Sequence, residues 1–213
     1  MKILESSSSR YDKGINYISL GSMKKVYDKI LPYCNIDSKI LDLGCGTGAL
    51  TLRAASKGSY VKGIDINAEM LNICRDRVKM AQLENKVTMQ EKGVAEITDE
   101  QPNSFDIVMS GLCFSELSED EINFTLKECF RLLKPKGFLI IIDEVVPKGV
   151  FKRILHLLIR IPVVIITYIL TQTTTKAVKK LPEKIQGSNF SIKSTEYAFL
   201  GSLMMVVAEK PES

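Results

Sequence analysis

The sequence predicts an α/β fold in which a mostly parallel sheet of seven strands carries helices on both faces and ends in an antiparallel hairpin. Short apolar runs alternate with helix-like segments from residue 39 to residue 142. A glycine-rich turn follows the first apolar run, in KILDLGCGTGAL at 39–50. The last apolar stretch, 190–208, is interrupted at Gly201 and Ser202, as in a pair of antiparallel strands.

The elements follow one another along the chain in a strand–helix–strand order. Strands are predicted at 39–43, 60–66, 86–90, 105–110 and 137–142, as short apolar runs typical of parallel strands buried on both faces. Helices are predicted at 49–57, 68–81 and 119–133, the last preceded by a capping box of Ser118 and Glu121. This alternation is typical of a parallel sheet with crossover helices.

Composition favours one soluble domain. The 213 residues are 45% hydrophobic, enough to bury a single sizeable core, so we expect one domain over 1–213. A net charge of +4 from 29 basic and 25 acidic residues indicates a mixed surface, and no nucleic-acid partner is expected. The five cysteines form no C-x-x-C pair, which indicates reduced thiols and no metal site. Because the N-terminus lacks a long apolar signal segment, we expect a cytoplasmic location.

The glycine-rich turn admits two interpretations. Gly44, Gly46 and Ala49 satisfy the dinucleotide pattern G-x-G-x-x-G/A, whereas Asp42 with Gly44, Gly46 and Gly48 satisfies D-x-G-x-G-x-G, which suits another nucleoside cofactor. Both patterns place the ligand beyond the carboxyl ends of the first strands. Asp65 lies 21 positions after Gly44 and ends the second strand, where a carboxylate can accept both ribose hydroxyl hydrogens.

Further motifs extend the resemblance beyond the glycines. With ILDLGCGTG at 40–48, the chain carries VKGIDINAEML at 61–71, NSFDIVMSG at 103–111, LLKPKG at 132–137 and LMMVVAEKP at 203–211. From Lys39 to the C-terminus it resembles class I S-adenosylmethionine-dependent methyltransferases, which have a Rossmann-like fold. SSSRYDKGI at 7–15 and the pair Asp143-Glu144 are similar to the ubiquinone/menaquinone C-methyltransferases, and also to corrinoid-protein-associated methyltransferases.

The resemblance implies S-adenosylmethionine as the cofactor and assigns its contacts. The glycines would lie under the methionine part, with Asp42 helping to orient the ammonium group through backbone or water, and Asp65 would hold the ribose. Many relatives carry G-D-A where this chain has Gly93-Val94-Ala95, so backbone there, or Glu96, is expected to contact adenine. The complete expected set is Tyr11, Asp42, Gly44, Gly46, Gly48, Asp65, Ile66, Met70, Val94, Ala95 and Ser110.

The resemblance implies methyl transfer by in-line displacement, for which the protein mainly aligns the reacting atoms. A general base is needed only when the acceptor arrives protonated. Candidates are Glu116, Asp143, Glu144 and the single histidine, His156. Glu116 can instead be an ordinary helix-start residue, and the acidic pair can form ion pairs with Lys148 or Arg153. For Cys113 and Met70, packing in the core is the alternative to a functional role.

Two flanking segments are expected to complete the domain: a helical cap at 1–35 and an apolar, basic insertion at 148–180. Within the insertion, Arg153, His156, Arg160 and Pro162 interrupt the apolar run, which weighs against a transmembrane helix. We expect the insertion to be a substrate lid, with peripheral contact of 150–175 to an anionic membrane surface as the alternative.

The methyl acceptor is expected to be a small, hydrophobic molecule or a carrier-bound group. Two other functions remain open on the sequence. One is an auxiliary S-adenosylmethionine-binding partner of a corrinoid protein, because the histidines common after the fourth strand in related chains are absent. The other is an NAD-dependent oxidoreductase, against which the terminal hairpin and the KPKG segment argue.

Overall fold

The computed structural model describes residues 22–147 and 176–212. Of the expected cap at 1–35, it describes helix α2 (Ser22–Asp28) and the turns that follow; of the expected insertion at 148–180, it describes the last five residues. Tyr11, His156, Lys148 and Arg153 lie outside the described residues. Within the described residues, no helix is long and apolar enough to cross a membrane.

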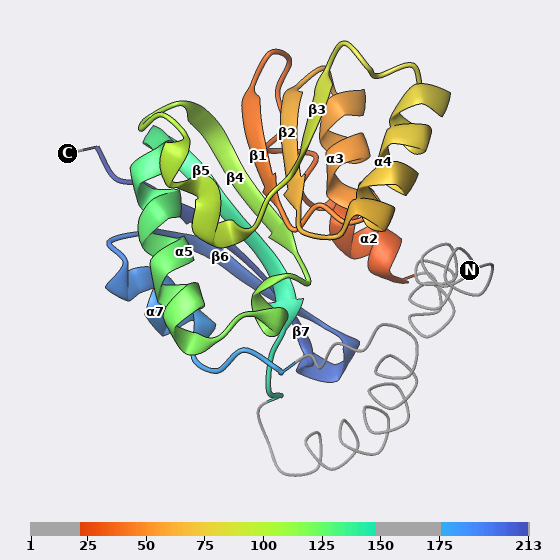
Figure 1. Ribbon diagram of the computed structural model, residues 1–213. Helices are drawn as coiled ribbons and strands as arrows, with labels where there is room; N and C mark the ends of the chain where they lie inside the picture. The colour runs from red at the N-terminus through yellow and green to blue at the C-terminus, as the bar shows by residue number, and fades with distance from the viewer. Residues whose placement is uncertain (1–21, 148–175, 213) are drawn as a thin grey trace.

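The described chain forms one seven-stranded sheet, which confirms the predicted fold class (Figure 1). Its strands are β1 (Lys39–Leu43), β2 (Tyr60–Asp65), β3 (Val87–Glu91), β4 (Phe105–Gly111), β5 (Leu133–Glu144), β6 (Ser191–Ala198) and β7 (Leu203–Glu209). The order is β3-β2-β1-β4-β5-β7-β6. Strands β1 to β5 pair in parallel, and β7 lies antiparallel between β5 and β6.

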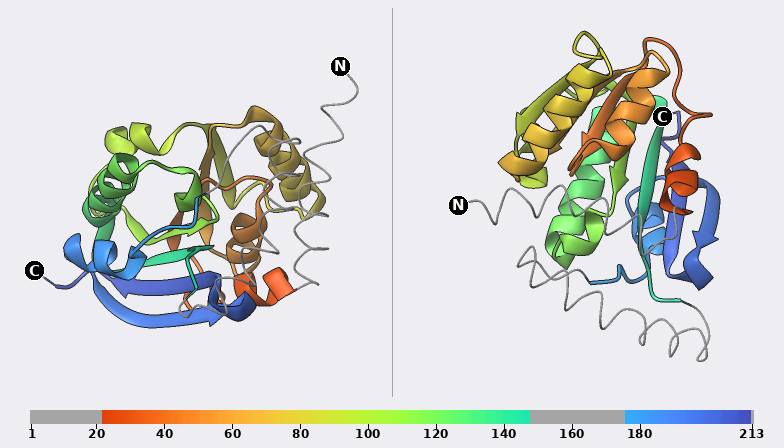
Figure 2. Two further views of the ribbon diagram at one scale, coloured as in Figure 1. Left: turned by 90° about the horizontal axis from the view of Figure 1, so that it is seen from below. Right: turned by 90° about the vertical axis from the view of Figure 1, so that its right-hand side faces the viewer.

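Helices cover both faces of the sheet (Figure 2). On one face, α2, α3 (Ala49–Ser56) and α4 (Ala68–Met80) pack on a core that includes Ile40, Ile107 and Ile140. On the other, α5 (Glu119–Leu132) and α7 (Leu181–Gly187) pack on a core that includes Leu41, Val108 and Ile141. Consecutive residues of one strand therefore enter opposite cores, which explains why the central strands are apolar throughout.

Strand β5 begins four residues before the predicted start at Gly137, because Leu133 already pairs with Phe105. The pairing shifts register between Phe105 and Ile107, and Lys136 adopts a left-handed conformation with φ 64°. A side chain at Gly137 would place its Cβ 2.8 Å from the Lys134 carbonyl oxygen. The KPKG segment is therefore an irregularity within the strand and not a loop before it.

Other local predictions hold where sequence signals are strong. The capping box of α5 is confirmed, since the Glu121 N–H donates to the Ser118 hydroxyl and the Ser118 N–H to the Glu121 carboxylate.

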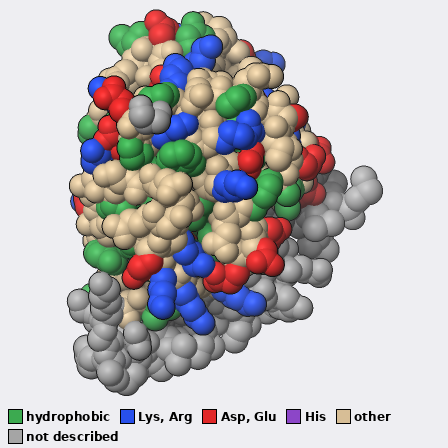
Figure 3. All heavy atoms as spheres, turned by 90° about the vertical axis from the view of Figure 1, so that its left-hand side faces the viewer, with side chains coloured by type: hydrophobic (Ala, Val, Ile, Leu, Met, Phe, Trp, Pro, Cys, Tyr) green, Lys and Arg blue, Asp and Glu red, His purple; other side chains and the backbone are tan. Residues whose placement is uncertain are grey.

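Acidic and basic side chains are interspersed on the face that α5 and α7 help to form (Figure 3). This agrees with the nearly balanced charge of the sequence.

Candidate active site at the carboxyl ends of the strands

The turn after β1 contains three glycines in left-handed conformations: φ is 64° at Gly44, 52° at Gly46 and 87° at Gly48. A Cβ on Gly44 would lie 2.6 Å from the Cys113 Cβ, and one on Gly48 would lie 2.6 Å from the Cys74 Sγ. A Cβ on Gly46 would meet no atom within 4 Å. The absence of a side chain at Gly44 and Gly48 therefore makes room for neighbouring cysteines, whereas at Gly46 it leaves the backbone beside open space.

Asp65, at the end of β2, joins this turn to the start of α4. Its Oδ2 accepts the Gly46 N–H at 2.8 Å, and its Oδ1 accepts the Asn67 N–H at 2.8 Å. Asn67 in turn caps α4, accepting the N–H groups of Glu69 and Met70. The half-buried carboxylate is thus fixed beside the open side of Gly46, and each oxygen retains a lone pair for a further donor.

Asp42 lies behind the turn and not on its surface. It is 1% exposed, its Oδ2 accepts the Thr51 hydroxyl at 2.6 Å, and its Oδ1 has no hydrogen-bond partner among the described residues. Burial raises the pKa of Asp42 to about 7, against the Thr51 hydrogen bond, which lowers it. A contact of Asp42 with a ligand would therefore have to be indirect, and Thr51 is a partner that the sequence did not reveal.

The expected adenine contacts lie together at the ends of β2 and β3. Ile66 is 75% exposed, and a Cβ on Gly93 would lie 3.3 Å from the Ile66 Cγ2. Val94 and Ala95 begin the short helix η1 (Val94–Asp99), and Met70 is half-buried. The Glu96 carboxylate accepts the Gly93 N–H at 2.9 Å, so it closes this turn, a local role that the sequence analysis did not assign.

The Ser110 side chain corrects one expectation. Ser110 is fully buried in β4, and its hydroxyl donates to the Leu43 carbonyl oxygen at 3.0 Å. The hydroxyl thereby links β4 to the end of β1 immediately before Gly44. Its side chain supports the glycine turn from within the sheet and is not exposed to a ligand.

The chain after β4 and the end of β5 carry the other acidic groups. The fully buried Asp143 accepts the Ser115 N–H at 3.2 Å and the Glu144 N–H at 2.7 Å. Burial raises the pKa of Asp143 to about 7, although both hydrogen bonds lower it. Glu116, in η2 (Phe114–Glu116), is exposed, yet partial desolvation and the Asp65 charge raise the pKa of its carboxyl group.

Cys113 lies where these acidic groups meet. It is half-buried against Gly44, and burial, Asp143, Glu116 and Asp65, in that order, raise the pKa of its thiol. A thiol held in this protonated state is a poor nucleophile, which agrees with a packing role. The structure thus brings the glycine turn, Asp65, Glu116 and Asp143 to one edge of the sheet.

The carboxyl groups of Asp42 and Asp143 should make the fold less stable as pH rises from about 4 to about 7. In that range the folded protein holds protons that the unfolded chain has released, because both folded pKa values, about 7, exceed the ordinary 3.8. Urea unfolding at about pH 5 and about pH 7.5 should show a smaller loss of stability in Asp143→Asn and in Asp42→Asn than in the parent. An unchanged or larger loss in both variants would contradict the assignment.

The geometry fits a nucleoside cofactor. The open side of Gly46 gives backbone access, and the adjacent Asp65 carboxylate can accept hydroxyl hydrogens. Ile66 offers an apolar surface near Gly93, one strand away. The site lies where β1 and β4 are neighbours and their following helices, α3 and α5, cover opposite faces (Figure 1). Such a switch point is the usual ligand position in an open α/β sheet.

Comparisons with known proteins agree with this geometry. Residues 40–137 match the family model described as a methyltransferase domain. The YqeM protein of Bacillus subtilis is 32% identical over 158 residues, which cover 70% of this chain and 61% of that protein. The ubiquinone/menaquinone biosynthesis C-methyltransferase UbiE of Wigglesworthia glossinidia brevipalpis is 32% identical over 66% of this chain and 57% of its own. The chain thus spans less than two thirds of the length of these curated relatives.

Solved structures share the fold at low sequence identity. A SAM-dependent methyltransferase from Methanosarcina mazei superposes with a TM-score of 0.67 and 22% identity, covering 86% of this chain and 97% of its own. The [4+2]-cyclase SpnF superposes with a TM-score of 0.70 and 16% identity, covering 89% of this chain and 81% of its own. At these identities the superpositions establish the fold alone.

Proposed function

We propose that the chain is a class I S-adenosylmethionine-dependent methyltransferase, which binds S-adenosylmethionine and transfers its methyl group to an acceptor; the match of residues 40–137 to a methyltransferase domain and the similarity to UbiE support this. The observation that carries this proposal is the open side of Gly46, fixed by the bond from its N–H to Asp65. It supplies both the backbone access and the ribose-binding carboxylate that this cofactor requires.

We assign the cofactor contacts to described residues as follows. The turn from Gly44 to Gly48 lies against the methionine part, the Asp65 carboxylate accepts the ribose hydroxyls, and Ile66, Met70 and the Val94-Ala95 backbone border the adenine. Bound there, S-adenosylmethionine supplies an electrophilic methyl carbon on a positively charged sulfur. The carboxylates of Asp65 and Glu116 favour that positive charge, since they lie close enough for Asp65 to raise the Glu116 pKa.

The residues of this chain contribute mainly alignment. The Ser115 N–H and the Glu144 N–H hold the buried Asp143 carboxyl group in one orientation at the end of β5. Glu116 is exposed and has a raised pKa, so we assign it the proton of an acceptor that arrives protonated. Positioning of this kind is worth about 7–11 kcal/mol of an activation barrier when reacting groups are well oriented.

The acceptor is proposed to be a small molecule or a carrier-bound group, with a corrinoid protein as a candidate partner. Named relatives span different chemistries: UbiE is a C-methyltransferase, and a Plasmodium falciparum relative, 34% identical over 48% of its own length, is a phosphoethanolamine N-methyltransferase. The names of these relatives therefore do not identify the acceptor atom of this chain.

Calorimetry with the full chain tests the cofactor assignment. S-adenosylmethionine and S-adenosylhomocysteine should both bind, because Gly46, Asp65 and the Val94-Ala95 backbone are arranged for the nucleoside that they share. NAD should bind at least roughly tenfold more weakly. Equal or tighter binding of NAD would instead support the dinucleotide interpretation of Gly44, Gly46 and Ala49, and would contradict this proposal.

A further inference from the structure

The glycine turn after β1 is rich in glycine and yet has one defined conformation. Gly44, Gly46 and Gly48 all have positive φ. Within the turn, the Gly48 N–H donates to the Cys45 carbonyl oxygen at 2.9 Å, and the Cys45 N–H donates to the Ile64 carbonyl oxygen of β2, also at 2.9 Å. Because glycine loses more conformational freedom on folding than any other residue, contacts from neighbouring elements are needed to fix such a turn.

Helix α4 supplies contacts of this kind. Its start is joined to the turn through Asp65, which accepts the N–H groups of Gly46 and Asn67. Further along the helix, the Cys74 Sγ lies so close to Gly48 that an added Cβ there would be 2.6 Å from it. The turn and α4 are therefore packed together at more than one point.

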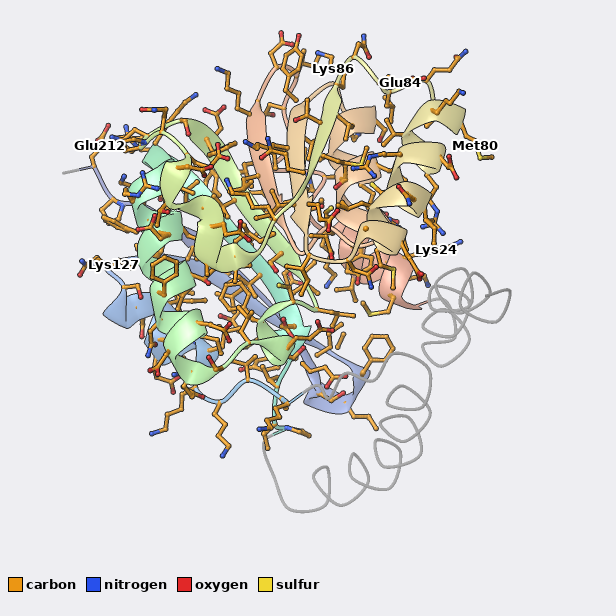
Figure 4. All side chains as sticks on the ribbon, in the orientation of Figure 1. Lys24, Met80, Glu84, Lys86, Lys127 and Glu212 are labelled. Carbon is orange, nitrogen blue, oxygen red and sulfur yellow. The ribbon has the colours of Figure 1, made fainter. Side chains whose placement is uncertain are left out.

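Arg77, in the last turn of α4, adds a hydrogen bond to these contacts. Its Nη1 donates to the Thr47 carbonyl oxygen at 3.1 Å. The helix ends at Met80, toward the end of the sheet where Lys86 precedes β3 (Figure 4), so the Arg77 side chain reaches back toward the site. Side chains of an α-helix tilt toward its N-terminus, which favours this direction.

This hydrogen bond fixes a peptide group inside the turn. The Thr47 carbonyl and the Gly48 N–H belong to the same peptide, and their partners are the Arg77 guanidinium and the Cys45 carbonyl oxygen. Thr47 is 4% exposed and Arg77 is half-buried, so water has little access to replace the bond. A charged donor also makes a stronger hydrogen bond than a neutral one. Loss of the guanidinium would therefore free this peptide to rotate.

We propose that Arg77 is a positioning residue for cofactor binding. It acts through the Thr47 carbonyl, and so holds the turn in the shape that receives the methionine part of S-adenosylmethionine. This inference rests on the proposed methyltransferase function and deepens it, because it adds a residue that the glycine motif does not contain.

The position of Arg77 gives its role a distinct signature. The nucleoside part of the cofactor is assigned to Asp65, Ile66 and the Val94-Ala95 backbone, whereas Arg77 bonds to the turn that is assigned to the methionine part. Loss of Arg77 should therefore weaken ligands that carry the amino-acid part and spare those that end at the sulfur. A general loss of stability would not distinguish the two kinds of ligand.

Binding measurements on the full chain compare two ligands with the same nucleoside. S-adenosylhomocysteine carries the amino-acid part, whereas 5′-methylthioadenosine has only a methyl group on its sulfur. Calorimetry on Arg77→Met should show S-adenosylhomocysteine binding at least roughly fivefold more weakly than to the parent. The affinity for 5′-methylthioadenosine, measured by displacement of S-adenosylhomocysteine, should stay within roughly twofold. Arg77→Lys should show the same selectivity with a smaller loss, since its ammonium group can still donate to the Thr47 carbonyl.

Arg75→Met is the matched control. Arg75 lies on the same helix, is exposed, and donates to the Asn72 side chain at 2.8 Å. Both affinities should therefore stay within roughly twofold of the parent in this variant. Urea unfolding of each variant records any general loss of stability. If Arg77→Met does not fold, Arg77→Lys replaces it in the comparison, and a loss that is not selective for S-adenosylhomocysteine counts against the inference.

The outcomes separate the inference from the function on which it rests. Equal weakening of both ligands in Arg77→Met, or unchanged binding of S-adenosylhomocysteine, would overturn the positioning role and leave the methyltransferase proposal standing. Failure of 5′-methylthioadenosine to displace S-adenosylhomocysteine from the parent would contradict the division of the site into two parts, and the inference with it. Failure of the parent to bind S-adenosylhomocysteine would overturn the proposed function itself.

Discussion

Replacing Asp65 by alanine is expected to weaken binding of S-adenosylhomocysteine by at least roughly tenfold. The carboxylate is proposed to accept both ribose hydroxyls, and each hydrogen bond to a charged group is worth about 1.5–3 kcal/mol. The structure adds a second cause. Asp65 also accepts the N–H groups of Gly46 and Asn67, so its removal releases the glycine turn from the start of α4.

Calorimetry on the parent and the variant measures the effect, and circular dichroism checks that the fold persists. Glu91→Ala is a matched control. Glu91 is exposed and lies opposite Asp65 in the pairing of β2 with β3, so the substitution removes the same charge from the same end of the sheet. It should stay within roughly twofold of the parent. An Asp65→Ala variant with affinity in that range would show that the ribose assignment is wrong.

The sequence predicted the fold well because its signals are local. Apolar runs separated by helix-like segments require parallel strands, and the break at Gly201 and Ser202 indicated the antiparallel end; both features are confirmed. The beginning of β5 was missed, because KPKG has turn composition. Pairing of Leu133 with Phe105 and the left-handed Lys136 keep that segment in the sheet, and these are tertiary effects.

The candidate site was predictable only in part. The glycine spacing and Asp65 are adjacent to strand ends that the pattern locates, so their positions followed from the sequence. The reason why each position must be glycine could not be read from the sequence. Gly44 lies against Cys113 and Gly48 against Cys74, and both cysteines are far along the chain. Nothing in the sequence indicates that Asp42 is buried or that the Thr51 hydroxyl is its hydrogen-bond donor.

The acidic side chains at the carboxyl ends of the strands show the same limit of sequence reasoning. Asp65, Glu116 and Asp143 are separated by dozens of positions, and only the strand order β2-β1-β4-β5 brings them to one edge. Burial first, and then the charges of these three residues, raise the pKa of the Cys113 thiol. The sequence also made Ser110 a cofactor contact, whereas its hydroxyl is used within the sheet, on the Leu43 carbonyl oxygen.

Replacing Gly48 by alanine is expected to lower the stability of the fold strongly, because two independent features require glycine at this position. Its φ of 87° costs any other residue about 1–2 kcal/mol. Its added Cβ would also lie 2.6 Å from the Sγ of Cys74, which is fully buried in α4. Overpacking of this kind costs about 1–3 kcal/mol, so Gly48→Ala should reduce the free energy of unfolding by about 2–5 kcal/mol.

Two further variants separate the causes. Gly46→Ala has comparable backbone strain, at φ 52°, but its Cβ meets no atom within 4 Å, so it should lose only about 1–2 kcal/mol of stability. Cys74→Ala removes the Sγ and leaves the Cys74 Cβ 3.6 Å from a Cβ at position 48, an ordinary contact. In a double-mutant cycle by urea unfolding, Gly48→Ala should therefore cost at least about 1 kcal/mol less in the Cys74→Ala background than in the parent. Equal costs in the two backgrounds would mean that backbone strain alone requires glycine at this position.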